Sequence, residues 1–359
     1  MSPEFVSNEE IVLAARRNLG QGAWDYLVGG SESETTLRRN RLAFDRWGFR
    51  PRILRDVSKI DTSTTFLGQR LRIPVMLAPI GSLQVFAPEG GAAAAQAAAE
   101  FGTIQVVSSV TLPSLEETAA AGAGPKVFQL YVNGDMAWVK DMLDRVRAAG
   151  YIALTLTVDT AIYSRRERPL LNRWAPPTRR GPLEGRRYLT ELTWESMDQI
   201  KAMWGGPFML KGVGTAEDAK LAVEHGVDVV WVSNHGGRQL DHALGSLDVL
   251  PEVVQAVGDR ASIVVDGGIQ RATDVLKAIA LGADAVAVGR LQAWGLGAAG
   301  KDGCLKVLEL LEHEMISGMG LLGITSLQQL GPEYVCRAEP VTPPHEMSAW
   351  ANMPGGRIL

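Results

Sequence analysis

The run Ser-Asn-His-Gly-Gly-Arg-Gln-Leu-Asp, residues 233–241, contains residue types that could act on a small acid. His235 can exchange protons near neutral pH, because imidazole titrates at about pH 6.5. Arg238 carries a permanent charge on a planar fork that fits a carboxylate. Gly236 and Gly237 allow a substrate to approach the backbone closely. A single histidine at such a place is more often structural, so a catalytic role for His235 depends on the surrounding chain.

This run follows a buried-looking apolar strand, and the same pattern recurs along the chain. Eight apolar runs alternate with segments whose apolar residues have helical spacing, as in parallel strands with crossover helices. The runs are 74–80, 104–109, 127–132, 153–159, 208–213, 227–234, 262–266 and 285–289. The helical segments include 89–101, 115–121, 137–149, 216–224 and 272–281. Eight such units predict an α/β fold, the (β/α)8 TIM barrel, with a doubly wound open sheet as the alternative.

The rest of the chain is predicted to belong to the same single domain, 1–359. Residues 1–72 are expected to form an N-terminal helical cap, 73–325 the barrel and 326–359 a C-terminal arm that wraps the barrel or a neighbour. The fourth and fifth strands are separated by an unusually long segment with arginine pairs and prolines. In a barrel, such a loop belongs to the catalytic face, so we expect a lid over 168–193.

Composition excludes several classes of protein. The 359 residues carry a net charge of −4, so no basic surface favours nucleic acid. Cys304 and Cys336 lack CxxC spacing and there is no HExxH motif, so neither structural zinc nor a disulfide framework is expected, and a reducing cytoplasm fits. No apolar run is long enough to cross a membrane, and no signal peptide is expected.

Polar residues and glycines stand at the carboxyl ends of the predicted strands, where barrels build their active sites. In chain order they are Pro79, Ile80, Gly81, Ser108, Gln129, Tyr131, Thr157, Asp159, Lys211, Ser233, His235, Asp266, Gly267, Gly268, Gly289 and Arg290. The glycines after the last two strands, with Arg290, occupy the usual phosphate position of barrels, and we interpret them as a cofactor phosphate site. Lys211 is open to two interpretations: a Schiff-base nucleophile, as in an aldolase, or a fixed cation beside a flavin ring.

These residues resemble those of the FMN-dependent α-hydroxy-acid oxidases and dehydrogenases, the group of glycolate oxidase, lactate oxidase and mandelate dehydrogenase. The run 233–241 is similar to the signature of that family. Other matching stretches are 25–26, 50–52, 88–90, 128–131, 157–159, 165–166, 211–212 and 266–268. The family fold is a (β/α)8 barrel, and its cofactor is FMN.

The resemblance implies a role for each substrate-facing residue. His235 would be the base, and Asp159 would stabilise its protonated form. Arg166 and Arg238 would hold the substrate carboxylate.

The resemblance also implies the reaction, oxidation of an (S)-2-hydroxy acid to a 2-oxo acid. Tyr26 and Tyr131 would hydrogen-bond the substrate, Tyr26 at its carboxylate. Either the Cα hydrogen leaves as hydride to flavin N5 while His235 takes the hydroxyl proton, or His235 takes the Cα proton in a carbanion route. Electrons would pass to O2 or to another acceptor, and a homotetramer or homo-octamer is expected.

The implied FMN contacts are spread over the strand ends. Lys211 would lie near N1 and O2 of the flavin, and Ser108, Gln129 and Thr157 would bind the isoalloxazine. Gly289 and Arg290 would bind the phosphate. The remaining expected cofactor contacts are Pro79, Ile80, Gly81, Ser233, Asp266, Gly267, Gly268, Gln270 and Arg271.

The chain departs from the family pattern at several positions. Gln270 replaces a usual arginine, with Arg271 next to it. Gly81 replaces alanine and is expected to open space over the flavin, and Val110 replaces an aromatic residue. These changes predict a less enclosed site and a substrate bulkier than glycolate. Another phosphate-binding barrel enzyme (a flavin isomerase or a Lys211-dependent aldolase) and a non-catalytic flavin-binding relative are the alternatives.

Overall fold

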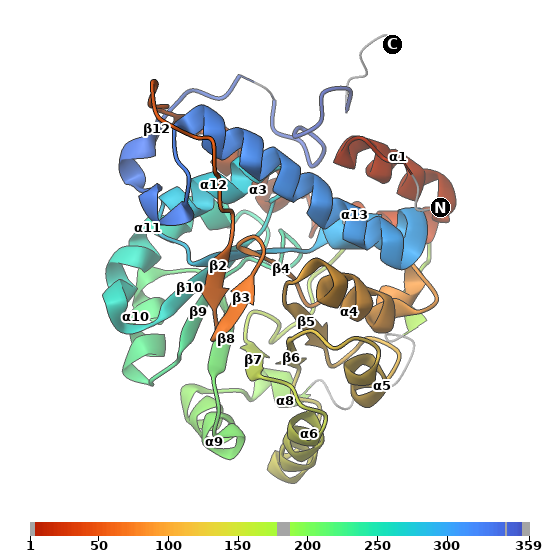
Figure 1. Ribbon diagram of the computed structural model, residues 1–359. Helices are drawn as coiled ribbons and strands as arrows, with labels where there is room; N and C mark the ends of the chain where they lie inside the picture. Colours follow the sequence, from red (N-terminus) through yellow and green to blue (C-terminus); the bar gives the residue numbers. More distant parts are fainter. Residues whose placement is uncertain (1–3, 178–186, 342, 354–359) are drawn as a thin grey trace.

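The eight predicted strands close into a parallel barrel in the computed structural model, which describes residues 4–177, 187–341 and 343–353. Neighbouring strands follow the order β10-β11-β4-β5-β6-β7-β8-β9, with helices on the outside (Figure 1). The strands are β4 Val75–Leu77, β5 Gln105–Ser108, β6 Lys126–Leu130, β7 Ala153–Thr157, β8 Phe208–Val213, β9 Val229–Val232, β10 Ser262–Asp266 and β11 Ala285–Val288. The barrel prediction is confirmed, and the open-sheet alternative is wrong.

The strands read as continuous apolar runs because both of their faces are buried. Side chains on one face, such as Met76, Met209 and Trp231, fill the barrel interior. Alternate side chains, such as Leu77 and Leu210, pack against the outer helices. Most of the polar side chains of the strands therefore stand near the strand ends, although Thr155 lies buried in the middle of β7.

The outer helices begin where the sequence offers caps. Asp135 and Thr215 accept backbone N–H groups at the starts of α6 and α10, and Ser114 with Glu117 forms a capping box on α5. The helices are α4 Gly90–Phe101, α5 Leu115–Ala120, α6 Met136–Ala148, α9 Trp194–Trp204, α10 Ala216–Glu224, α11 Ser246–Val257, α12 Ala272–Ala280 and α13 Arg290–Leu322. A break at Ala299 and Gly300 divides α13 into two helices.

The predicted N-terminal helical cap is correct only for its first part. Helices α1 Asn8–Asn18, α2 Gln21–Val28 and α3 Thr35–Asp45 are followed by strands β1 Trp47–Phe49, β2 Thr64–Phe66 and β3 Gln69–Leu71. The β2–β3 hairpin turns at Leu67 and Gly68, with φ values of 50° and 70°, as a tight two-residue turn requires. Its Phe66 and Leu71 are buried in the barrel's interior cluster, so the hairpin closes one end of the barrel.

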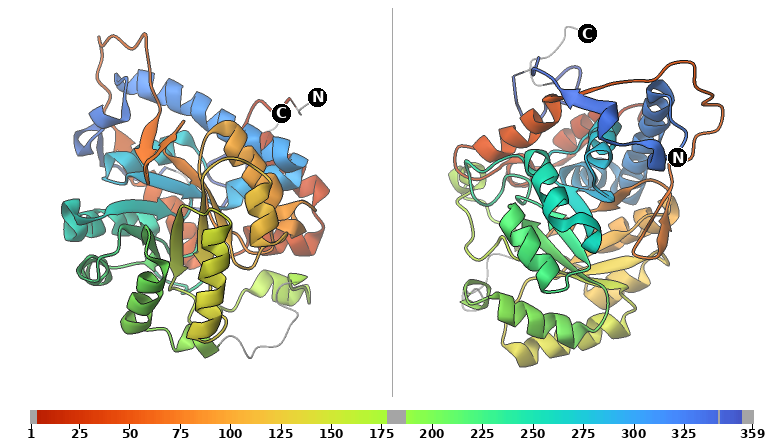
Figure 2. Two further views of the ribbon diagram at one scale, coloured as in Figure 1. Left: turned by 60° about the horizontal axis from the view of Figure 1, so that its bottom comes forward. Right: turned by 90° about the vertical axis from the view of Figure 1, so that its left-hand side faces the viewer.

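The segment expected to form a C-terminal arm packs on the rest of the chain at two described places. Strand β12 Val335–Arg337 pairs antiparallel with β1, so the two ends of the chain share a small sheet (Figure 2). Further on, Trp350 is buried against Trp294 of α13. The arm is therefore part of the folded domain.

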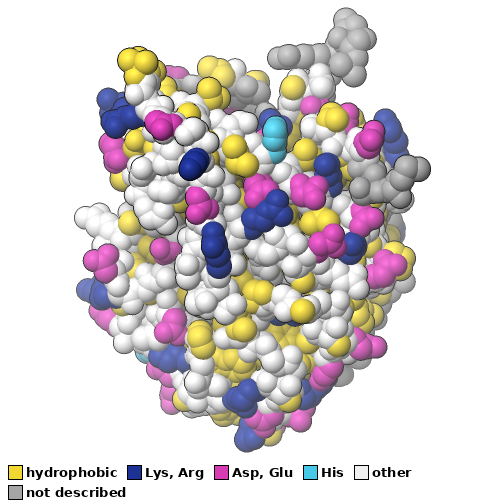
Figure 3. Space-filling model, viewed as in Figure 1, with side chains coloured by type: hydrophobic (Ala, Val, Ile, Leu, Met, Phe, Trp, Pro, Cys, Tyr) yellow, Lys and Arg dark blue, Asp and Glu magenta, His cyan; other side chains and the backbone are white. Residues whose placement is uncertain are grey.

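In the described part of the predicted lid segment 168–193 lie most of α7 Glu167–Leu171 and all of α8 Arg187–Thr190. Residues 178–186, with Arg179, Arg180 and Arg186, lie outside the described part of the chain. Among the described residues, no helix is long and apolar enough to cross a membrane. Figure 3 shows positive and negative side chains interspersed on the face that carries the hairpin, without a basic patch there.

Candidate active site

A cavity of about 410 Å³ opens at the carboxyl ends of the barrel strands, within the size range of small-molecule sites. Most of the predicted site residues line it: Tyr26, Pro79, Ile80, Gly81, Tyr131, Arg166, Lys211, His235, Arg238, Asp266, Gly267, Gly268, Gln270, Gly289 and Arg290. The other six, which do not line it, are Ser108, Gln129, Thr157, Asp159, Ser233 and Arg271. Of these six, Asp159 and Ser233 hydrogen-bond side chains that do.

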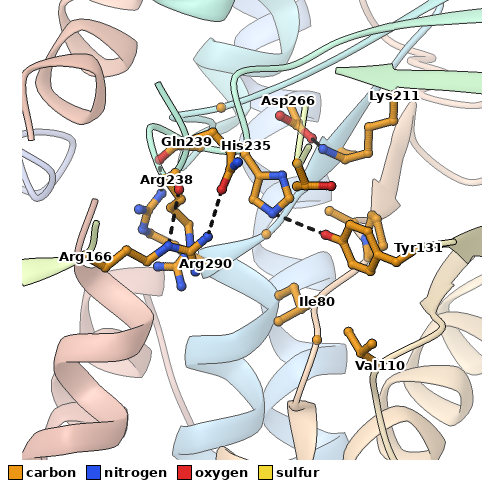
Figure 4. A pocket seen from close by; sticks show the side chains of 18 of the residues that line it. Ile80, Val110, Tyr131, Arg166, Lys211, His235, Arg238, Gln239, Asp266 and Arg290 are labelled. Atoms are coloured by element: carbon orange, nitrogen blue, oxygen red, sulfur yellow. Dashed lines mark hydrogen bonds and ion pairs between the residues drawn. The ribbon is translucent and has the colours of Figure 1, made fainter. Parts of the chain in front are cut away.

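His235 lies on a tight turn just after β9. Residues His235, Gly236 and Gly237 have φ values of 58°, 66° and 75°, three successive left-handed conformations. Histidine tolerates this region better than most residues, and glycine does so freely. A Cβ at Gly237 would lie 2.6 Å from the backbone of Leu37, so this position also requires glycine for space. The turn holds the imidazole in the cavity (Figure 4).

The imidazole is held between Asp159 and Tyr131. Its Nδ1 lies 3.1 Å from Oδ1 of Asp159, and its Nε2 lies 3.5 Å from the hydroxyl of Tyr131. A carboxylate on Nδ1 keeps the proton there and leaves Nε2 as the basic nitrogen. The structure thus brings Asp159 and His235 together from the segments that follow two different strands.

Burial and charge both act on the protonation of this pair. Burial lowers the pKa of His235 below its ordinary 6.5, against the opposing charge of Asp159, and Lys211 and Arg166 lower it further. Burial alone would raise the pKa of Asp159, but its hydrogen bond with His235 and the charge of Lys211 hold that pKa below its ordinary value. The pair therefore consists of a neutral imidazole and an ionised carboxylate at neutral pH.

Arg166 and Arg238 lie on one side of His235 (Figure 4). The Arg238 guanidinium stacks 4.9 Å from the ring centre of Tyr26 and donates to the carbonyls of Tyr26 and Gly29 at 2.7 and 2.8 Å. The Arg166 guanidinium lies 4.3 Å from the ring centre of Tyr163. Two fixed guanidinium groups beside one imidazole form a site for a carboxylate next to a transferable proton.

Lys211 is fixed by a buried carboxylate. Its Nζ lies 2.7 Å from Oγ of Ser233 and 3.0 Å from Oδ2 of Asp266, and Ser233 donates to Asp266. A Schiff-base nucleophile needs an amine that is free to attack a substrate, whereas the contacts with Asp266 and Ser233 engage Nζ of Lys211. The structure favours the interpretation of Lys211 as a fixed cation.

The chain is similar in sequence to a family of known proteins. Residues 15–337 match the model of a protein family described as FMN-dependent dehydrogenase.

The chain belongs to the family of FMN-dependent dehydrogenases.

Individual relatives agree with this assignment. An L-lactate oxidase of Nostoc sp. is 39% identical over 347 residues, covering 89% of this chain and 95% of the relative. Glycolate oxidase 3 of Arabidopsis thaliana is 40% identical over 355 residues, covering 92% and 96%. The crystal structure of a mandelate oxidase superposes with a TM-score of 0.87 at 38% identity, covering 94% of this chain and all of the other (100%).

The buried polar groups of the barrel fit the FMN of this family. Nε2 of Gln129 and Oγ1 of Thr157 are buried at strand ends with no hydrogen-bond partner among the described residues. Oε1 of Gln129 accepts from Ser108 at 2.7 Å, which fixes the amide and leaves Nε2 as a free donor. Buried polar groups normally have partners, and the pyrimidine edge of a flavin offers both acceptors and a donor.

The glycine-rich ends of β10 and β11 fit the phosphate. Gly267 and Gly268 have φ values of 102° and 85°, and a Cβ at Gly268 would lie 2.9 Å from the carbonyl oxygen of Asn40. Gly289 precedes the first turn of α13, where free N–H groups and the helix dipole favour an anion. The guanidinium of Arg290, the next residue, donates to the carbonyls of Gly236 and Gly29 at 2.9 Å and lies beside Arg238. Burial and the charge of Arg238 lower the pKa of Arg290 to about 9, so an added anion would stabilise its charged form.

The two residues that depart from the family pattern here have different surroundings. Gln270 lines the cavity and donates 2.7 Å to the carbonyl of Glu346. The expected cofactor contact of the Arg271 side chain is not supported, because Arg271 points elsewhere. Its guanidinium pairs with Glu314 at 3.2 Å and lies 5.6 Å from the ring centre of Trp350.

Gly81 was expected to leave open space over the flavin, but the side chain of Val110 lies against this position. A Cβ at Gly81 would lie 2.8 Å from Cγ2 of Val110, so the valine methyl group fills the space that the missing side chain leaves. Val110 itself lines the cavity and is 38% exposed. The two substitutions therefore act together on the shape of the cavity.

Sequence reasoning missed several lining residues. Arg41 of α3 is buried at the cavity and ion-pairs with Asp274 at 2.8 Å. Gln239 donates to the carbonyl of Asp159 at 2.8 Å and so supports the His235 partner. Glu346 reaches the cavity from the C-terminal arm. Gln239 lies within the run 233–241, whereas no local motif marks Arg41 and Glu346, because both come to the site through the packing of distant segments.

Proposed function

We propose that this chain oxidises an (S)-2-hydroxy acid to the 2-oxo acid, with FMN as its cofactor. The observation that carries this proposal is the neutral His235, supported by Asp159, beside the guanidinium groups of Arg166 and Arg238. The names of the relatives, L-lactate oxidase and glycolate oxidase, indicate the same class of substrate. His235 can take the proton of the substrate's hydroxyl group, and the two arginines can bind its carboxylate.

The residues divide the chemistry among them. Arg166 and Arg238 bind the substrate carboxylate and fix its Cα. Nε2 of His235 accepts the hydroxyl proton, while Asp159 stabilises the imidazolium ion that forms. Tyr131 lies 3.5 Å from Nε2 and positions the hydroxyl group at the base. Bound FMN would supply the acceptor for the Cα hydrogen, which leaves with its two electrons as hydride.

The same site supports a substrate bulkier than glycolate. Val110 stands where the family pattern has an aromatic side chain, and its methyl group occupies the space beside Gly81. Trp138 and Leu189 provide further apolar lining. The mandelate oxidase structures include one with (S)-mandelic acid bound, so this fold can hold an aryl substrate. We infer that a lactate-sized or aryl side chain fills this apolar part of the cavity.

The acceptor, assembly and location are proposed on less specific grounds. The relatives named as oxidases favour O2 over another electron carrier. A homotetramer or homo-octamer is proposed as the assembly, in which exposed apolar side chains such as Leu171 and Leu240 would be available for contacts between copies. The unpaired Cys304 and Cys336 support a cytoplasmic location, although one relative is a peroxisomal (S)-2-hydroxy-acid oxidase of Oryza sativa.

The test is an anaerobic screen of flavin reduction. Purified enzyme is mixed without O2 with glycolate, (S)-lactate, (S)-mandelate and a long-chain 2-hydroxy acid, and bleaching of the flavin is recorded. We expect bleaching, fastest with the larger acids, and rapid recovery of the flavin in air. Bleaching by none of these acids would exclude the proposal and favour an isomerase or a non-catalytic flavin protein. A preference for glycolate would exclude only the bulky substrate.

A further inference from the structure

The end of the chain reaches the cofactor cavity. We call residues 343–353 the strap; they follow β12 and lie beyond residue 337, where the match to the family model ends. Figures 1 and 2 show this segment lying beside α13. Glu346 of the strap lines the cavity together with Gln270, Gly268 and Arg290. These three neighbours belong to the part of the cavity that fits the phosphate.

Two contacts fasten the strap at the cavity wall. Nε2 of Gln270 donates 2.7 Å to the carbonyl oxygen of Glu346, and both side chains are almost fully buried. The Glu346 carboxylate accepts 2.7 Å from Arg168, which also bonds to Glu34. Glu346 thus connects the end of the chain to the loop after β10, to α7 and to the N-terminal region. Such buried, charge-assisted contacts are costly to break.

The strap is also fastened by contacts that lie outside the cavity. Trp350 is 3% exposed and packs edge-to-face against Trp294 of α13, with ring centres 6.5 Å apart. The backbone N–H of Asn352 donates 3.0 Å to Glu9 of α1. Opening the strap would break these contacts and expose the Trp350 ring to water.

We propose that the strap is the outer wall of the FMN site at its phosphate end and limits the release of FMN. A ligand between the barrel and the strap cannot leave on this side until Glu346 separates from both Gln270 and Arg168. Because coupling between binding sites is reciprocal, bound FMN also stabilises the closed strap. This inference rests on FMN binding and does not depend on which acid is the substrate.

The experiment measures how fast FMN leaves the complete enzyme and two truncated forms. One form ends at Pro344 and lacks most of the strap, and the matched control ends at Met353 and keeps its described contacts. Flavin fluorescence, which rises on release, is followed after dilution of the FMN-loaded proteins, without any hydroxy acid. We expect release at least tenfold faster from the Pro344 form and an unchanged rate for the Met353 form. Equal rates for both forms would overturn the proposal.

A point variant keeps the test decisive if the Pro344 form does not fold. Trp350 does not line the cavity, so Trp350→Ala weakens the strap without removing a contact to the ligand. Trp194→Ala on α9, where the ring stacks on His225, is the control for loss of a tryptophan. We expect faster FMN release from the Trp350 variant only, with circular dichroism unchanged. Unchanged release from a folded Trp350→Ala protein would also overturn the proposal.

Discussion

Nδ1 of His235 lies 3.1 Å from Oδ1 of Asp159, across the barrel mouth between the ends of β9 and β7. The chain thereby brings an imidazole and a carboxylate together from the segments that follow two separate strands. Gln239, which follows His235 in the sequence, donates to the carbonyl of Asp159 and ties the two segments together. The pair depends on the barrel and cannot form from either segment alone.

His235→Asn is expected to abolish substrate oxidation while FMN stays bound. The amide cannot accept the hydroxyl proton, and general base catalysis typically contributes about 10²–10⁴-fold. Anaerobic flavin reduction by stopped flow measures the loss, and the visible spectrum reports the bound FMN. His225, which pairs with Asp198 at 2.8 Å on the surface, provides the matched control. His225→Asn should leave the rate unchanged, and a normal rate for His235→Asn would contradict its role as the base.

The rate should persist at mildly acidic pH. Because burial lowers the pKa of His235 below 6.5, the imidazole is neutral and able to act as a base at pH 6.5. Activity should fall only as pH decreases through this lowered pKa. Asp159 opposes the lowering, so Asp159→Asn should move the acidic limb to still lower pH and also reduce the maximal rate. The pH profile of kcat/KM measures both effects, and an acidic limb centred above pH 6.5 would contradict them.

Arg166→Gln is expected to weaken substrate binding and oxidation. A charge-assisted hydrogen bond to a carboxylate contributes about 1.5–3 kcal/mol, so kcat/KM should fall about 10- to 150-fold. The neighbouring Arg165 has a side chain that is 68% exposed and pairs with Glu167. Arg165→Gln is therefore a control that should change little. Similar losses in both variants would show that the general charge of this loop, and not a clamp, promotes binding.

Lys211→Met should slow flavin reduction and destabilise the fold. The Asp266 carboxylate would remain buried without its cation, and breaking such a pair typically costs about 3–5 kcal/mol. In the double variant Lys211→Met/Asp266→Asn, no uncompensated charge remains, so the melting temperature should partly recover while the rate stays low. Thermal unfolding and stopped-flow reduction separate the two effects. Recovery of the rate in the double variant would indicate that Lys211 has only a structural role.

Local sequence patterns were sufficient to predict the barrel strands and the residues at their ends. Strands such as 208–213 were recognisable because burial on both faces requires continuous apolar residues. The β2–β3 hairpin was not predicted, because its strands have only three paired residues each and are partly polar. These residues become part of the core only because they cover the end of the barrel. For the same reason Arg41 and Glu346 were missed, because their positions depend on how the two ends of the chain pack onto the cavity.

Gly81→Ala should narrow the cavity and shift the substrate preference toward smaller acids. The new methyl group would lie 2.8 Å from Cγ2 of Val110, so Val110 must move further into the cavity. We expect kcat/KM for (S)-mandelate to decrease more than that for (S)-lactate. Gly81→Ala/Val110→Ala removes the clash and should restore the ratio of the two values, while Val110→Ala alone should favour the aryl substrate. An unchanged ratio in all three variants would show that the substrate side chain lies away from this wall.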